Sequence, residues 1–304
     1  MVDYIERAGT KSWVDRTAFP FPSKFLPTRW GDLHYVDEGP REAEAVLLVH
    51  GTPSWSFEYR HAIAALARSR RVIAYDHLGF GLSARPLDFA YTPEAHAEVL
   101  RELVDGLSLS RFALVVHDYG GPIALPFAAA APERITSLVV MNSWMWRLSD
   151  DPELARSARF AASRVGRFLY RWLNASLRLL MPYAYADKRK LTPEIHAQYL
   201  APFPTRDARE LVLWRLARYL AEPSARLERL WQDRALLAGI PALIVWGLGD
   251  RALPPRVLAR LRSALPQARV EELRGVGHWP QEEAPAQVAA LLDGFLPSGH
   301  RAAR

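Results

Sequence analysis

The most constraining feature of this chain is a sharp turn between an apolar strand and a glycine-led helix. The turn lies in the segment VVHDYGG, where Asp118 follows the apolar run Phe112–Val116 and precedes Gly120 and Gly121. This strand–turn–helix context is that of a nucleophile elbow, which presents a reactive side chain at the end of a buried strand. The usual serine motif G-x-S-x-G does not occur in the sequence. We therefore expect Asp118 to be the nucleophile.

An aspartate nucleophile differs from a serine in the chemistry that it can perform. Serine must lose a proton as it attacks, whereas a carboxylate with a reference pKa of about 3.9 is already an anion at neutral pH. Asp118 can therefore attack an sp³ carbon without a separate base.

Short apolar runs alternate along the chain with longer helical patterns, which indicates an α/β fold with a parallel sheet covered by helices. Helices are predicted at Glu58–Ala67, at Thr92–Asp105 with Thr92 as the N-cap, and at Gly120–Ala131. The predicted strands are Asp32–Val36, Ala45–His50, Arg71–Asp76, Phe112–His117, Ser137–Met141, Ala242–Trp246 and Arg269–Leu273.

The strand pattern stops after Met141 and resumes near Pro241. The intervening sequence is helical, rich in Arg, Leu, Tyr and Trp, and interrupted by prolines. We expect residues 148–231 to form a helical insertion, here called the lid. Residues 1–147 and 232–304 would then form the core domain.

The charge balance permits several kinds of partner. The chain has 39 Lys and Arg against 33 Asp and Glu, a formal net charge of +6. A positive charge of this kind can indicate binding to nucleic acid or to an anionic membrane. The arginines between residues 156 and 178 recur around an amphipathic pattern instead of forming one block, which is typical of exposed helices. Nucleic-acid-binding signatures are also absent, so we predict neither a nucleic-acid nor a membrane partner.

The composition also limits the chemistry and the compartment. The sequence has no cysteine, which excludes thiolate catalysis and disulfides. The segment MVDYIERAGTKSW carries acidic residues where a signal peptide needs an apolar stretch, so a cytoplasmic location is expected. No HExxH, EF-hand or phosphate-binding glycine motif occurs, so neither a metal nor another cofactor is implied.

Two further polar residues follow predicted strands in the order expected of a catalytic triad. Asp250 lies in GLGDRALPP after one strand, and His278 lies in RGVGHWPQEEAP after the next. Sites in open α/β sheets form outside the carboxyl ends of the strands. Asp118, Asp250 and His278 therefore have the order nucleophile, acid and base.

A His-Gly turn supplies a fourth element of the predicted site. In LLVHGTPSW, Thr52 follows a buried strand. The backbone N–H groups of Thr52 and Tyr119 would provide two hydrogen-bond donors for negative charge that develops during the reaction.

Four motifs together resemble a known family. HGTPSWSFEYR, DHLGFGLSARP, VVHDYGGP and GVGHWPQEE are similar to segments of the haloalkane dehalogenases and their relatives in the α/β-hydrolase superfamily. The resemblance covers most of the chain outside the lid. It implies an α/β-hydrolase fold, with a mostly parallel sheet flanked by helices and a helical cap inserted after the sixth strand. It also implies a cofactor-free mechanism in which Asp118 forms an alkyl-enzyme ester and His278, oriented by Asp250, activates the water that cleaves it.

The chain departs from that family at two positions. The dehalogenases hold the leaving halide with a tryptophan after the nucleophile and an Asn, Gln or Glu after His-Gly, whereas this chain has Tyr119 and Thr52, which carry hydroxyl donors. Carbon–halogen hydrolysis is the main prediction. The alternatives are epoxide hydrolysis, β-lactone decarboxylation and a small-molecule receptor. Epoxide hydrolysis would use tyrosines of the lid, which are Tyr170, Tyr183, Tyr185, Tyr199 and Tyr219.

The expected substrate is a small apolar organic molecule. Trp55, Trp144 and Trp146 lie beside predicted strand ends, where they would line an apolar pocket. The sequence leaves the oligomeric state open.

Overall fold

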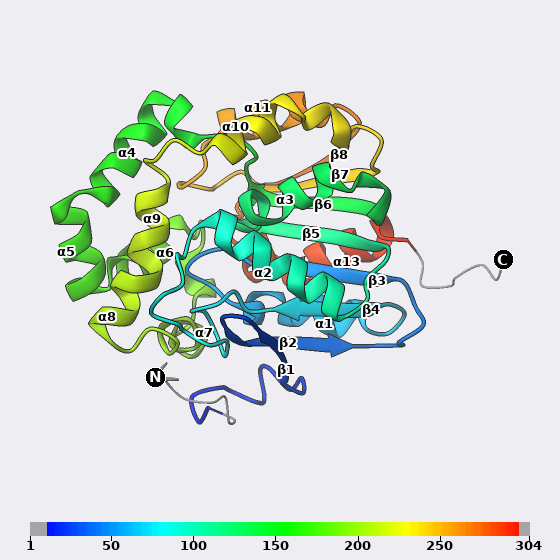
Figure 1. Cartoon of the computed structure of the whole chain (residues 1–304), viewed down its shortest axis with the longest axis horizontal. Helices are drawn as coiled ribbons and strands as arrows, with labels where there is room; N and C mark the ends of the chain where they lie inside the picture. Colours follow the sequence, from blue (N-terminus) through cyan, green and yellow to red (C-terminus); the bar gives the residue numbers. More distant parts are fainter. Residues whose placement is uncertain (1–10, 298–304) are drawn as a thin grey trace.

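The computed structural model describes residues 11–297, which form one mixed sheet between two layers of helices (Figure 1). The eight strands have the spatial order β1-β2-β4-β3-β5-β6-β7-β8. Strand β2 is antiparallel to both of its neighbours, and the other neighbouring pairs are parallel. The strands are β1 (Lys24–Thr28), β2 (Gly31–Glu38), β3 (Ala45–Val49), β4 (Arg71–Tyr75), β5 (Phe112–Asp118), β6 (Ile135–Ser143), β7 (Ala242–Gly247) and β8 (Arg269–Leu273).

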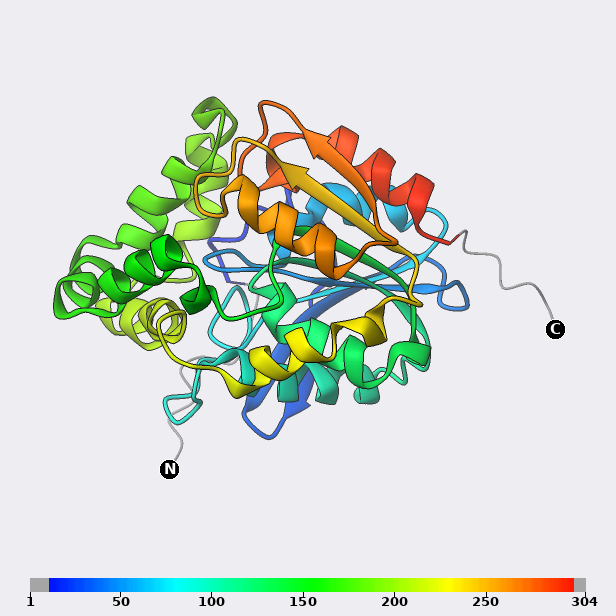
Figure 2. The same cartoon turned by 90° about the horizontal axis from the view of Figure 1, so that it is seen from above.

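The central strands are apolar because helices cover both of their faces. Every residue of β3, β5 and β7 is buried. Helices α1 and α13 pack together on one face, and α2, α3 and α10 pack on the other (Figure 2). The helices outside the predicted lid are α1 (Arg60–Leu66), α2 (Pro93–Gly106), α3 (Gly120–Ala130), α11 (Pro255–Ala264), α12 (Pro280–Glu283) and α13 (Pro285–Phe295).

The predicted α/β architecture is confirmed, and each predicted strand is present to within about two residues at either end. Thr92 caps α2 as predicted, because its hydroxyl accepts a hydrogen bond from the Ala95 N–H at 3.3 Å. The predicted helix Glu58–Ala67 begins as a 3₁₀ turn at Ser56–Tyr59 and continues as α1. The sequence analysis did not predict β1, which contains Pro27. A proline is tolerated in this strand because β1 lies at the edge of the sheet. The sequence analysis also missed α11 and α13.

The register of the sheet brings several strand ends to one edge. Val49 of β3 pairs with Val116 of β5, which pairs with Val140 of β6. A register shift follows between His117 and Asp118. The segments after β3, β5, β6, β7 and β8 therefore start from the same edge, where the predicted site residues lie.

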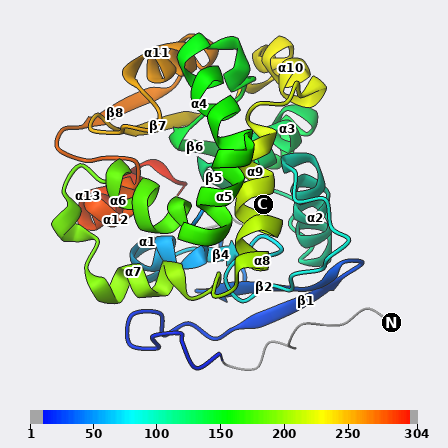
Figure 3. The ribbon, with the colours of Figure 1, turned by 90° about the vertical axis from the view of Figure 1, so that its left-hand side faces the viewer.

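Between β6 and β7 the chain forms helices beyond one end of the sheet (Figures 1 and 3). One of them, α10, packs against α3 of the core although it falls within the predicted lid. None of the described helices is long and apolar enough to cross a membrane. The helices of this segment are α4 (Pro152–Ala162), α5 (Arg164–Leu173), α6 (Met181–Ala184), α7 (Pro193–Leu200), α8 (Arg206–Ala208), α9 (Arg215–Tyr219) and α10 (Ala225–Gln232).

Candidate active site

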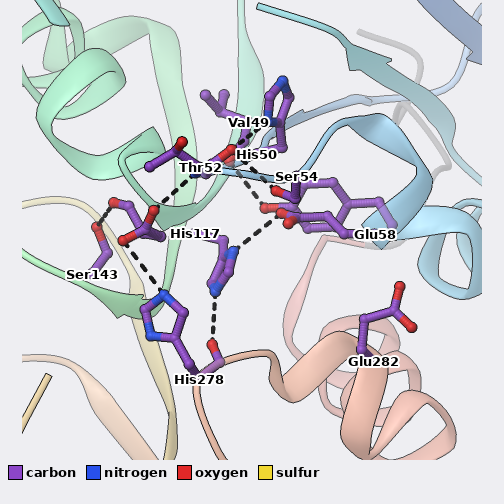
Figure 4. A network of polar contacts seen from close by, with 12 residues as sticks. Val49, His50, Thr52, Ser54, Glu58, His117, Ser143, His278 and Glu282 are labelled. Carbon is purple, nitrogen blue, oxygen red and sulfur yellow. Dashed lines mark hydrogen bonds and ion pairs between the residues drawn. The ribbon is translucent and has the colours of Figure 1, made fainter. Parts of the chain in front are cut away.

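Asp118 lies at a tight backbone turn at the end of β5. Its φ of 47° is in the left-handed region, which is strained for a residue with a side chain. A Cβ at Gly51 would overlap the Asp118 side chain, and one at Gly120 would overlap the Val49 carbonyl, so both positions need glycine. The Ser143 hydroxyl donates to the Asp118 carbonyl at 2.6 Å (Figure 4). The fold therefore fixes the backbone that presents the carboxylate.

The structure brings Asp118, Asp250 and His278 together, although they are distant in sequence. His278 Nδ1 lies 2.7 Å from Asp250 Oδ2, and His278 Nε2 lies 3.5 Å from Asp118 Oδ1. All three side chains are buried. The His278 backbone N–H also donates to the Ala184 carbonyl of α6 at 3.0 Å, so the loop that carries this histidine contacts the predicted lid.

Asp250 is oriented by donors from its own loop and from β6. Its Oδ1 accepts hydrogen bonds from the Ala252 and Leu253 N–H groups at 2.7 and 2.9 Å. Its Oδ2 accepts one from Asn142 Nδ2 at 2.7 Å. The sequence reading missed Asn142, although its place directly after the apolar part of β6 was a usable signal.

The charges of the triad shift one another's pKa values. Burial alone would lower the pKa of His278, but the Asp250 carboxylate and the hydrogen bond to Asp118 outweigh it and raise the pKa to about 10. Burial alone would raise the pKa of Asp118, but His278 and the Thr52 N–H hold it below its usual value. The contacts therefore favour the protonated form of His278 and the ionised form of Asp118.

A second buried pair supports the histidine loop. His117 Nε2 lies 2.8 Å from the His278 carbonyl oxygen, and His117 Nδ1 lies 3.2 Å from Glu58 Oε1 (Figure 4). Both side chains of the pair are fully buried. The pair positions the backbone of His278 without touching its ring nitrogens. The sequence reading gave it no role, although Glu58 and His117 lie inside two of the quoted motifs.

The two glutamates after His278 hold the same loop against its surroundings. Glu283 accepts hydrogen bonds from the N–H groups of Gly277, Ala186 and Asp187 at 2.9, 3.0 and 3.2 Å. Its neighbour Glu282 is buried and pairs with Arg60 and with the Tyr199 hydroxyl. The glutamates of the WPQEE segment are thus structural, and they tie the histidine loop to the predicted lid.

Comparison with known proteins identifies the family. The sequence profile of the alpha/beta hydrolase fold matches residues 44–285. Haloalkane dehalogenase 2 of Mycobacterium tuberculosis is 34% identical over 281 residues, which are 91% of this chain and 96% of the relative. This chain belongs to the α/β-hydrolase family. Within that family it is a haloalkane dehalogenase-like enzyme.

A decarboxylase is as similar to this hydrolase in sequence as the dehalogenase. The cis-3-alkyl-4-alkyloxetan-2-one decarboxylase of Shewanella oneidensis is 34% identical over 288 residues, which are 92% of this chain and 90% of the relative. Among solved structures, an ancestral haloalkane dehalogenase has a TM-score of 0.80 at 27% identity, and covers 90% of this chain and 97% of its own. The dehalogenase DbeA of Bradyrhizobium elkani has a TM-score of 0.78 at 28% identity. The match covers 90% of this chain and 98% of DbeA.

Thr52 and Tyr119 lie on the two segments that flank the Asp118 carboxylate of this hydrolase. The Thr52 N–H donates to Asp118 Oδ2 at 2.9 Å, so this donor lies beside the carboxylate. The Tyr119 hydroxyl donates to the Leu216 carbonyl of α9 at 2.6 Å. In this structure the hydroxyl proton is thus engaged with α9, and a role for Tyr119 in holding a leaving group stays a prediction.

The three predicted pocket tryptophans are all buried. Trp144 packs edge-on against Tyr119 with ring centroids 5.2 Å apart. Trp55 donates its indole N–H to the Gln198 carbonyl at 3.0 Å, and Trp146 packs against Trp231. Among residues 11–297, no group of three or more His, Asp or Glu side chains is arranged to hold a metal ion.

Proposed function

We propose that this enzyme hydrolyses its substrate through a covalent ester on Asp118. The carboxylate displaces a leaving group from carbon, and His278 then removes a proton from the water that attacks the ester carbonyl. Asp250 holds the imidazole through Nδ1, so that Nε2 faces Asp118. The 3.5 Å separation of His278 Nε2 from Asp118 Oδ1 carries this proposal, because it leaves the base beside the carbon that water must attack.

The charges of the site suit a two-step reaction. In the resting enzyme Asp118 is an anion and contributes to the raised pKa of His278. Formation of the ester removes that negative charge, so the pKa of His278 falls. The imidazole therefore becomes a base at the step that needs one.

We propose a small haloalkane as the substrate and carbon–halogen hydrolysis as the reaction. The named dehalogenase relatives support this, as does the buried, aromatic surrounding of Asp118. The backbone N–H of Thr52 would help to stabilise charge at the reacting centre. The protein acts without a cofactor in this proposal, in the cytoplasm, and residues 148–231 serve as its lid with α10 as the anchor onto α3.

A β-lactone is the second candidate substrate, because the decarboxylase relative is as similar as the dehalogenase and because the Tyr119 hydroxyl is already bonded to Leu216. Attack of Asp118 on the sp³ ring carbon that is bonded to the ring oxygen would break that carbon–oxygen bond and give an alkyl ester of Asp118 with a free carboxylate. That intermediate can lose CO₂ and expel Asp118 while a carbon–carbon double bond forms. This route needs no water.

An epoxide would need an acid from the lid. The hydroxyl of Tyr199 bonds to Glu282, and that of Tyr219 bonds to Glu94 and Ser224. Burial raises the pKa of Tyr170 to about 12. The charge of Asp118 adds to this increase, and a hydrogen bond to Ser176 opposes it. Tyr170, and Tyr185 whose buried hydroxyl has no hydrogen-bond partner among the described residues, are the lid tyrosines to replace with phenylalanine if epoxides are turned over. A receptor would bind these compounds without consuming them.

A single-turnover experiment in H₂¹⁸O tests the proposal and separates its alternatives. Water that cleaves the ester attacks the enzyme carbonyl, so hydrolysis should place ¹⁸O in the Asp118 peptide, as read by mass spectrometry. A 1-bromoalkane and a β-lactone should be run in parallel. Label in Asp118 with bromide release supports the dehalogenase, and alkene with unlabelled Asp118 supports the decarboxylase. Label found only in the product contradicts the covalent mechanism.

A further inference from the structure

Large apolar side chains are exposed on one part of the lid. Residues 160–183 are only 24 of the 287 described residues, yet they carry eight of the ten large apolar side chains that the structure leaves exposed between residues 11 and 297. About half of each of these side chains is accessible. We call the eight the lid apolar surface: Phe160, Val165, Phe168, Trp172, Leu173, Leu179, Leu180 and Tyr183.

Helix α5 turns its apolar side outward. Val165, Phe168 and Trp172 have the spacing of one helix face, and the rings of Phe168 and Trp172 stack with centroids 6.2 Å apart. On the other side of α5, Gly166 is buried and Tyr170 packs against the core. Figure 3 looks onto this side of the molecule and shows α5 and α6 facing the viewer. An amphipathic helix normally buries its apolar side. In α5 that side is exposed, so it is free to contact a partner.

Exposed arginines occur close in sequence to the residues of the lid apolar surface. Arg156, Arg159, Arg164 and Arg178 are exposed, and none forms an ion pair with another described residue. The guanidinium of Arg206 lies over the ring of Trp172 at 3.8 Å.

The lid also carries the whole net charge of the protein. Residues 148–231 have fifteen Lys and Arg against nine Asp and Glu, a net charge of +6, which equals that of the full chain. The rest of the chain has 24 of each sign. The exposed apolar side chains and the excess positive charge therefore occur in the same segment.

We propose that the lid apolar surface docks onto the surface of a bilayer that contains anionic lipids. Aromatic and apolar side chains enter the headgroup region, while arginines beside them pair with lipid phosphates. Contact with a second copy of the chain is disfavoured because two lids of charge +6 would face each other. No described helix can cross a membrane, so the contact is peripheral. This proposal replaces the expectation, drawn from the sequence, that the protein has no membrane partner.

The docking does not depend on the reaction proposed above, so it can be tested by binding alone. The full chain should sediment with vesicles of phosphatidylcholine and phosphatidylglycerol, but not with phosphatidylcholine alone. Added salt should weaken the binding because it screens the charges. Arg156→Glu with Arg159→Glu should lower the partition coefficient by about tenfold or more. Phe168→Ser with Trp172→Ser should also lower it.

Matched variants on the core domain control for charge and apolarity. Arg68→Glu with Arg101→Glu changes two exposed arginines that form no ion pair with a described residue. A second control, Leu87→Ser with Leu236→Ser, changes the two exposed leucines outside the lid apolar surface. Neither control should alter vesicle binding. All variants should keep the melting temperature and the turnover of a water-soluble substrate.

Several results would overturn the proposal. The first is failure of the wild type to bind anionic vesicles. The second is equal binding by the lid and core variants. The third is a wild type that does not bind vesicles but forms a dimer in sedimentation velocity, with the dimer lost in Phe168→Ser with Trp172→Ser. If the serine variant does not fold, Trp172→Phe replaces it. Brominated lipids should then quench the wild-type fluorescence more than that of Trp172→Phe, and equal quenching contradicts the docking.

Discussion

The edge of the sheet and the lid are built in opposite ways. At the sheet edge, Asp118, Asp250 and His278 are buried, and each has hydrogen-bond or ion-pair partners that fix its position. The lid carries the whole net charge and most of the exposed large apolar side chains. The first region is complete within the chain, whereas the second presents groups that normally require a partner. We infer that the sheet edge determines the chemistry, and that the lid determines which partner surface the protein binds.

The two regions are nevertheless joined by a few specific hydrogen bonds. The Tyr119 hydroxyl donates to the Leu216 carbonyl, and the His278 N–H donates to the Ala184 carbonyl. Each of these bonds starts from a residue at or next to the proposed catalytic groups. A change at the sheet edge can therefore alter how the lid is held, although the lid supplies no member of the triad.

Asp118→Asn should have the largest effect, because it removes the proposed nucleophile. We expect turnover to fall on the order of 10⁵-fold or more, with no covalent adduct in freshly prepared protein. Binding to anionic vesicles should be unchanged if the two regions act separately. Adduct mass spectrometry and vesicle sedimentation measure the two properties. Rapid adduct formation by the asparagine variant would show that another residue attacks the substrate.

His278→Phe should stop the reaction after its first step. Turnover should fall on the order of 10⁴-fold, while one equivalent of alkyl-enzyme accumulates, because only the water step needs the base. Intact-protein mass spectrometry after addition of a bromoalkane detects the adduct. If substrate is consumed in excess of enzyme at the wild-type rate, His278 is not the base.

Asn142 offers a smaller test of how the sheet edge is ordered. Asn142→Ala should slow ester cleavage by about tenfold, because Asp250 loses one charge-directed hydrogen bond. Asn142→Asp should slow it further, because a second carboxylate beside Asp250 would repel it. Rapid-quench measurement should find the alkylation step almost unchanged in both variants. A selective loss of alkylation would instead place Asn142 at the first step.

Tyr119→Phe tests the connection between the two regions. The buried Leu216 carbonyl would lose its donor, so the free energy of unfolding should fall by about 1–3 kcal/mol. Urea denaturation measures this loss, and Trp144→Phe next to the same ring is a control that leaves the bond in place. We expect kcat to change by less than about threefold if the hydroxyl only holds the chain. A much larger loss of bromide release without loss of stability would assign the hydroxyl to the leaving group.

The raised pKa of His278 predicts that the stability of the protein depends on pH. The pKa is about 10 in the folded protein, compared with about 6.5 for an unperturbed histidine. The folded state therefore binds the proton more tightly, so this stabilisation is complete below pH about 6.5 and is lost as the pH rises towards 10. Urea denaturation at several pH values should show this decline. Asp250→Asn should flatten it, and an unchanged slope in that variant would contradict the assigned ion pair.

The sequence alone predicted the sheet and the order of the triad because each depends on local patterns. The apolar runs of β3, β5 and β7 are distinct from their surroundings, and the polar residues that follow them mark the strand ends. A parallel sheet brings those ends together whatever the details of packing. Weaker local signals were missed, such as β1 with its internal proline.

The tertiary structure decided how these residues are supported and which surfaces remain uncovered. Asn142 and Asp250 are 108 positions apart, and His117 and Glu58 are 59 apart, so no local pattern shows that they meet. The same holds for the Tyr119 hydroxyl and the Leu216 carbonyl. The amphipathic pattern of α5 was visible in the sequence, but such a pattern does not say which side of a helix faces the protein. That is decided by the neighbouring elements, and here packing at Gly166 and Tyr170 turns Phe168 and Trp172 outward.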